Sequence, residues 1–490
     1  MWNRRNLSMM FCQMMFGLSF YGVMIILTRF FLEDLSYNEA DTMMVVGAFA
    51  AIGPLFGIAG GVIADKFLGA YRSLTISFAA FAGGYALLVF GATTANVALA
   101  LVGIALASYS RGLMFPSYQS LLKRTFTSEE NFENGYPVNY SVNNVGALLS
   151  QYFFPLIVLV TGFYFGFLLS SLMALAGFIV LFGFRRALVS VGAEIDQQPV
   201  SIKNWIIYLV ISLAMIGLVF FMFSDMEIGQ NLVYAIGAIA LLYFVYLMLF
   251  RVERKESWSM ATIIIMMILT TAFFVYYGQM MTSMTMVSIN TMRGDLFGFI
   301  PIAPEASMSM NPLWCMVAGP VIAFLFSSLE KRNIHFSAAT KVAFAFVLTA
   351  IAFGILTLAT LTIGKDMVIR PEIFLVIHFF QAFAEVIVGT MVVAFILSVA
   401  PKHIENFSVS LFSVAIALSG IVGAVFSTSI ALEKGQELTQ SFIQQVYGGY
   451  FKTFTIMAVI LVIVAFVASA LIRKMLANGK KSEELALSEA

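Results

Sequence analysis

The sequence has few charged residues, few histidines and few cysteines. Only 11% of its 490 residues are Asp, Glu, Lys or Arg, whereas a soluble domain carries roughly a quarter. The net charge is +1, which gives no electrostatic reason to expect a nucleic-acid partner. The three histidines have no metal-ligand spacing, and we find neither a phosphate-binding loop nor a nucleophile–base set. We therefore expect no enzyme, no ATP-driven pump, and neither a metal nor another bound cofactor.

Apolar residues make up 61% of the chain, and they gather in long blocks. A block of about 20 apolar residues crosses a ~30 Å hydrocarbon layer as a helix, which satisfies its own backbone in lipid. The pattern predicts an all-α polytopic membrane protein in which Cys12 and Cys315 are buried free thiols. Its fourteen spans are expected at residues 8–31, 41–66, 71–92, 97–123, 134–161, 163–185, 204–223, 231–250, 258–290, 310–329, 338–363, 371–400, 404–431 and 450–473.

Lys and Arg are distributed unevenly between the two ends of these spans. With the amino terminus in the cytoplasm, 20 of the 27 lie at cytoplasmic ends, so we expect both termini there. Two six-helix halves joined by a helical linker are typical of transporters built from repeats. The predicted parts are an N-terminal bundle, a linker with two helices, a C-terminal bundle and a flexible cytoplasmic tail, at residues 1–187, 188–256, 257–475 and 476–490.

Two charges, Arg111 and Glu385, lie about midway along predicted helices. An unpaired charge at that depth costs at least ~2.5–3.5 kcal/mol, so each needs a partner, water or a ligand. One interpretation is a structural Arg111–Glu385 pair between the halves. The other is a wet central cavity in which Arg111 attracts an anionic group and Glu385 binds an amine or carries a proton. Because desolvation favours the protonated form of a carboxyl group, Glu385 is the candidate for proton coupling.

Neutral polar side chains occur at a similar depth on several spans. Tyr140, Asn143 and Asn144 share one helical face in "YPVNYSVNNVGALL". Each such residue by itself is more typical of contacts between helices. Together they favour a substrate cavity, whose candidate lining residues also include Tyr21, Gln279 and Asn311.

Five segments resemble the proton-dependent oligopeptide transporter family of the major facilitator superfamily. "GGVIADKFLGAYRSL" is similar to the loop between its helices 2 and 3, and "NYSVNNVGALL" to its second signature. "SFYGVMIIL", "NPLWCMVAGPVIA" and "AEVIVGTMVVAFILSVAP" resemble its helices 1, 8 and 10. The resemblance implies the major facilitator fold, with two six-helix bundles plus two extra central helices. It also implies a conformational loop motif formed by Gly61, Asp65, Lys66, Gly69 and Arg72.

The resemblance also implies residue roles, and several family charges are missing. Tyr21, Asn144, Asn311 and Glu385 would contact a peptide, with Glu385 at its amine. The helix-1 stretch that carries two acids and one base in the family reads "QMMFG" here and has no charge. Met24 and Phe115 replace the cations that usually bind the substrate carboxylate, and Gly278 replaces a helix-7 acid. Phe412 stands at a tryptophan position of the site. Arg111 lies one helical turn before Phe115, so we expect it either to replace the anion anchor or to neutralise Glu385.

The sequence therefore predicts a secondary transporter in a bacterial inner membrane that works by alternating access. Its expected substrates are peptide-like or other small organic, zwitterionic or anionic solutes. A proton gradient is a possible energy source through Glu385, and the protein is expected to work as a monomer. The alternatives are an exporter of a drug or secreted metabolite and a non-transporting receptor or scaffold with the same fold.

Overall fold

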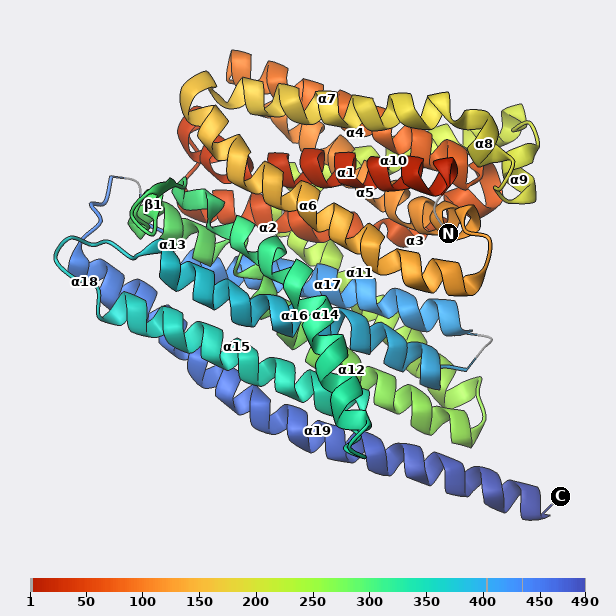
Figure 1. Cartoon of the computed structure of the whole chain (residues 1–490). Coiled ribbons are helices and arrows are strands. Elements are labelled where there is room, and N and C mark those ends of the chain that lie inside the picture. Colours follow the sequence, from red (N-terminus) through yellow and green to blue (C-terminus); the bar gives the residue numbers. More distant parts are fainter. Residues whose placement is uncertain (1–2, 402–403, 434, 490) are drawn as a thin grey trace. The chain divides into compact units, whose positions relative to one another are not determined.

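The computed structural model describes residues 3–401, 404–433 and 435–489, nearly all of them helical (Figure 1). Within those ranges, 14 helical segments are long and apolar enough to cross a membrane, which confirms the predicted number. The chain forms two compact units, residues 1–230 and 231–490. This division falls inside α11, and the predicted bundle boundaries stay predictions. Cys12 and Cys315, both among the described residues, are buried thiols and not disulfide partners, as expected.

The first unit is built from helices whose ends are set by polar caps and glycines. Asn3, Asn38, Asn96, Ser128 and Ser201 accept hydrogen bonds from backbone N–H groups at the starts of five of them. The elements are α1 (Arg4–Arg29), η1 (Phe30–Asp34), α2 (Glu39–Leu55), α3 (Gly57–Ile63), η2 (Ala64–Leu68), α4 (Ala70–Thr94), α5 (Val97–Thr125), α6 (Glu129–Thr161), α7 (Phe163–Gly183), α8 (Arg185–Val189), α9 (Glu194–Gln197) and α10 (Ile202–Ser224).

The second unit begins within α11 and holds the remaining helices and one short hairpin. Its apolar core includes Phe346 on α15 and Val388 on α16. The elements are α11 (Met226–Phe250), α12 (Arg254–Gly278), α13 (Ser283–Thr291), β1 (Asp295–Leu296), β2 (Ile300–Pro301), η3 (Pro304–Ser309), α14 (Met310–Glu330), α15 (Ala338–Leu361), α16 (Pro371–Val399), α17 (Glu405–Ser427), η5 (Thr428–Ile430), α18 (Gln440–Phe442), η6 (Ile443–Tyr447) and α19 (Gly448–Glu489). The helix α19 includes most of the tail, whose flexibility stays a prediction.

Two spans that the sequence predicts as continuous helices are interrupted. The span at 41–66 divides into α2 and α3 next to Pro54, which has no N–H to continue the helical ladder. The span at 258–290 divides into α12 and α13, which are separated by a turn at residues 279–282. At this turn Thr282 leaves the helical region with φ −120° and ψ −94°. The first break is the single residue Phe56, which keeps right-handed helical dihedral angles. The second places non-helical backbone within a membrane span, where it must be satisfied by neighbouring protein groups.

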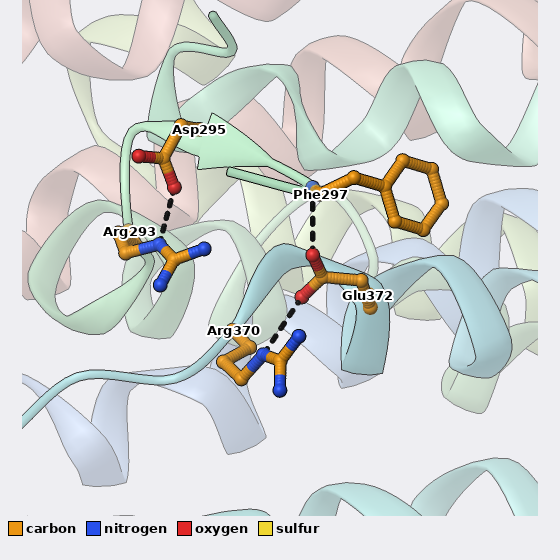
Figure 2. Close-up of polar contacts among 5 residues, drawn as sticks. All are labelled: Arg293, Asp295, Phe297, Arg370 and Glu372. Carbon is orange, nitrogen blue, oxygen red and sulfur yellow. Dashed lines mark hydrogen bonds and ion pairs between the residues drawn. The ribbon is translucent and has the colours of Figure 1, made fainter. Parts of the chain in front are cut away.

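The hairpin between α13 and η3 is fastened to the start of α16 (Figure 2). Glu372 accepts hydrogen bonds from the backbone N–H of Phe297 at 2.7 Å and from Nε of Arg370 at 3.2 Å. Phe297 lies in the left-handed region with φ 55°, so this contact holds a tight turn. Arg293 forms an ion pair with Asp295 in the same hairpin. A carboxylate at the start of α16 thereby fixes the turn of this hairpin.

The conformational loop motif binds the linker that follows α8. Asp196 on α9 accepts a hydrogen bond from the N–H of Tyr71 at 2.9 Å, at the start of α4. Its other carboxylate oxygen accepts from the N–H of Ala193 at 3.0 Å. Gly69 has φ +88°, and a Cβ there would lie 2.3 Å from the Asp196 carboxylate. Arg72 donates to three backbone carbonyls, those of Leu68, Ile195 and Gln198.

The other motif residues lie on α3 and η2. Gly61 is near Pro116 of α5, because a Cβ at Gly61 would be 3.8 Å from that proline's Cβ. Asp65 and Lys66 are exposed on η2. The motif thus combines a glycine in ordinary contact with α5, a glycine that admits a buried carboxylate, and an arginine that binds the linker backbone.

We expect Asp196→Ala to destabilise the first unit by about 1–3 kcal/mol, because it leaves one buried and one partly buried N–H group without their acceptor. The free energy of unfolding in detergent, measured by chemical denaturation, checks this. Glu194→Ala is the matched control, since Glu194 is exposed and accepts from the Gln198 side chain. The control should change stability by less than about 0.5 kcal/mol. Equal effects of the two substitutions would contradict the role assigned to Asp196.

Candidate functional site

Glu385 on α16 is the centre of a polar cluster in the second unit. Its Oε2 accepts a hydrogen bond from Nδ2 of Asn311 at 3.0 Å and a weaker one from Sγ of Cys315 at 3.5 Å. Tyr277 of α12 is a further hydrogen-bond partner of this carboxyl group. Asn311 and Cys315 are buried on α14, whereas Glu385 is only partly buried. The cluster therefore orients the carboxyl group of Glu385 through two neighbours on α14 and one on α12.

An aromatic wall stands beside this cluster. The ring of Tyr277 packs edge-on against Phe274 with centroids 5.6 Å apart, and Phe274 packs in the same way against Phe412 at 5.7 Å. Phe412 is therefore connected to Glu385 through two rings, and the family's tryptophan is replaced by a ring without a hydrogen-bond donor. The wall offers an apolar surface next to a carboxyl group, an arrangement suited to an amphipathic solute.

Gln279 lies in a separate, closed network at the break between α12 and α13. Its Oε1 accepts from the hydroxyls of Ser283 at 2.6 Å, Ser427 at 2.9 Å and Tyr450 at 2.5 Å. Its Nε2 donates to the carbonyls of Val275 and Gly423, both at 3.1 Å. The side chain has no exposed surface in this structure. Gln279 therefore joins α12, α13, α17 and α19, and its expected substrate contact stays a prediction.

The polar face of α16 continues beyond Glu385 to residues that the sequence analysis does not single out as a site. His378 and Gln381 precede Glu385 by seven and four positions, a spacing that places all three on one helical face. Both side chains are buried, and Nε2 of Gln381 contacts Sδ of Met284 at 3.2 Å. Within the described residues, neither Nδ1 of His378 nor Oε1 of Gln381 makes a well-formed hydrogen bond. Their spacing of four and seven positions from Glu385 is the signal that could have revealed them.

Arg111 on α5 is partly buried in the first unit, among groups from α1 and α2. Its Nη1 donates a hydrogen bond to the carbonyl of Ala50 at 2.8 Å. Its guanidinium also lies over the ring of Phe20, 4.5 Å from the centroid. The bond to Ala50 satisfies part of the guanidinium, which has five N–H donors. Arg111 therefore connects α5 to both α1 and α2.

The other candidates of the first unit lie on α1 and α6. Tyr21 packs edge-on against Phe20, the ring that carries the Arg111 guanidinium, with centroids 5.3 Å apart. Tyr140 is 40% exposed on α6, and its carbonyl accepts from Nδ2 of Asn144 at 3.0 Å. The Asn143 backbone packs closely on Gly17 of α1, where a Cβ would lie 2.6 Å from the Asn143 carbonyl oxygen. Tyr21 and Arg111 thus contact the same ring, and Asn143 takes part in a tight α1–α6 crossing.

The structure therefore brings together some of the predicted site residues within each unit. Asn311 touches Glu385 directly, and Phe412 reaches it through the aromatic wall. Arg111 belongs to the first unit and Glu385 to the second. Their direct pairing stays a prediction.

A family model described as the POT family matches residues 71–443, most of the chain. The chain belongs to the POT family. The family resemblance drawn from the motifs is thereby confirmed, and so is the expectation that the protein is a transporter and not an enzyme.

Curated relatives of this POT family member include dipeptide and tripeptide permease B of Salmonella typhimurium, which is 25% identical over 416 residues, or 84% of each chain. The permease A of Chromobacterium violaceum is 27% identical over 414 residues, covering 82% of this chain and 80% of the relative. Their similarity extends over most of both chains.

Solved structures with the same fold include a bacterial homologue of the human drug peptide transporters PepT1 and PepT2, with a TM-score of 0.84 at 21% identity. That match covers 96% of this chain and 99% of the other. A crystal structure of tetrameric PepTSo2 has a TM-score of 0.85 at 22% identity and covers 96% and 98%. These likenesses confirm the predicted fold class. This POT family member is a multi-pass membrane protein.

Proposed function

We propose that this POT family member is a secondary transporter of dipeptides, tripeptides and similar small zwitterionic solutes. The observation that carries the proposal is the carboxyl group of Glu385, held by Asn311 and Cys315 beside an aromatic wall. A carboxylate in a site of low dielectric binds an ammonium group more strongly than it does in water. The names of the curated permeases support a short peptide as the solute.

Within this proposal the substrate is recognised through its two charged ends and its side chain. Glu385 and Asn311 bind the amino group, and the positive charge of Arg111 attracts the carboxylate. Phe412 provides apolar surface. Tyr21, Tyr140, Asn143, Asn144 and Gln279 complete the proposed lining.

Transport proceeds by alternating access in a bacterial inner membrane, with both termini in the cytoplasm. The two compact units are the bodies that move, and the loop motif from Gly61 to Arg72 is part of the conformational machinery. The protein functions as a monomer. Because one similar solved structure is described as tetrameric, mass measurement in detergent or nanodiscs is the direct check.

Proton coupling is proposed through Glu385, since the helix-1 stretch Gln13–Gly17 carries no charge. We expect dipeptide uptake into proteoliposomes to be several-fold faster when the outside solution is more acidic than the lumen. Uptake should be slower when the lumen is the more acidic side. Counterflow exchange of labelled dipeptide without any gradient tests transport separately. Exchange without gradient stimulation would exclude coupling and leave transport intact. Binding without exchange would contradict the transport proposal and support a receptor.

A further inference from the structure

The bend between α2 and α3 leaves one backbone carbonyl without its helical donor. Pro54 is inside α2, and in a regular helix its N–H would bond to the carbonyl of Ala50, four residues earlier. Proline has no N–H, so the Ala50 carbonyl loses this partner. A backbone acceptor left unsatisfied within a membrane span is costly, because lipid offers no replacement.

Arg111 supplies the missing donor from another helix. Its Nη1 lies 2.8 Å from the Ala50 oxygen, the distance of a good charge-assisted hydrogen bond. The side chain reaches this carbonyl by crossing Gly53, where an added Cβ would be 2.7 Å from Cδ of Arg111. A glycine at that position, one residue before the proline, is what allows the guanidinium to approach the bend.

The helices beside the bend are in close contact, so the guanidinium acts on a tightly packed joint. A Cβ at Gly60 of α3 would lie 2.2 Å from the Gly112 carbonyl of α5, and a Cβ at Gly112 would lie 2.5 Å from Cβ of Phe56. Small residues permit such backbone approach between membrane helices. On its other side, the guanidinium rests on the ring of Phe20 from α1. Arg111 thus links α1, α2 and α5 at the level of the break.

We propose that Arg111 is a positioning residue that holds the bend of the second membrane helix by replacing the hydrogen bond that Pro54 removes. This role goes beyond the proposed substrate contact and does not depend on it. The helix that follows the bend, α3, leads directly into η2 and the loop motif. By fixing the bend, Arg111 sets where that motif begins.

The proposal is tested by a double-mutant cycle, because Pro54→Ala returns an N–H that can bond to the Ala50 carbonyl. We expect Arg111→Met to lower the melting temperature of the purified full chain in detergent by about 3 °C or more. In the Pro54→Ala background, the same substitution should cost less than half as much. Pro320→Ala, which removes a proline inside α14 of the second unit, is the matched control and should leave the full loss. Equal losses in the Pro54→Ala and wild-type backgrounds, or no loss at all, would overturn the proposal.

A second readout separates positioning from binding of an anion. A dipeptide with an amidated carboxyl end has no carboxylate for Arg111 to bind. We expect Arg111→Met to lower its maximal exchange rate at least threefold with little change in KM, and Pro54→Ala to restore the rate. Arg111→Lys serves as the conservative variant if Arg111→Met does not fold, and its melting temperature should likewise depend on Pro54. If Pro54→Ala restores neither the melting temperature nor the rate, the proposed positioning role is refuted.

Discussion

Glu385→Gln is expected to reduce kcat/KM for uptake of a dipeptide with a free amino group by about 30- to 150-fold. The substitution keeps the shape of the side chain and an oxygen that accepts from Asn311, but it removes the negative charge. A charge-assisted hydrogen bond in a largely dry site contributes about 2–3 kcal/mol, which corresponds to a loss of that size. Concentration-dependent exchange in proteoliposomes measures it.

The matched control for this substitution is a chemically modified substrate. An N-acetylated dipeptide has no ammonium group, so its weaker exchange should be nearly the same in the wild type and in Glu385→Gln. The melting temperature should remain close to the wild-type value, since the neutral amide can still bond to Asn311. An equal fall for the free and the acetylated peptide would show that Glu385 does not recognise the amine.

The membrane spans could be predicted because apolar blocks of sufficient length are a local property of the chain. The breaks within two of them depend on different information. Pro54 gives a sequence signal for the break after α2, since proline cannot continue the helical ladder. The break between α12 and α13 has no proline, and it is maintained by hydroxyl groups that come from distant helices. Sequence spacing within one helix cannot reveal partners of that kind.

The candidate site shows the same limit. The depth of Glu385 and the resemblance of its helix predict its importance, and Asn311 is correctly included near it. Cys315 follows Asn311 by one helical turn, yet its thiol was expected only to fill space. The Arg111 contact with Ala50 could not be read from side-chain types at all, because its acceptor is a backbone carbonyl. Charged residues in spans are readily noticed, whereas the backbone groups that they satisfy appear only in three dimensions.

The network around Gln279 leads to the second large expected effect. This buried amide oxygen accepts from three hydroxyls, while its nitrogen donates to Gly423 across to α17. Thr282, at the turn, is also within 2.6 Å of the Ser427 hydroxyl. The turn is therefore fixed to two neighbouring helices by side chains that exclude solvent. Removing its central acceptor should loosen the joint between α12 and α13.

We expect Gln279→Leu to lower the free energy of unfolding by about 3–5 kcal/mol, because several buried donors lose their acceptor together. Tyr450→Phe is the control within the same network: it removes one hydroxyl and should cost about 1 kcal/mol. Chemical denaturation in detergent measures both. If the Gln279 network only positions the helices, Gln279→Leu should slow exchange of the free and the N-acetylated dipeptide by the same factor. The opposite result would be unchanged stability together with a changed preference between these two peptides. That result would show that Gln279 contacts the substrate and that the network does not stabilise the turn between α12 and α13.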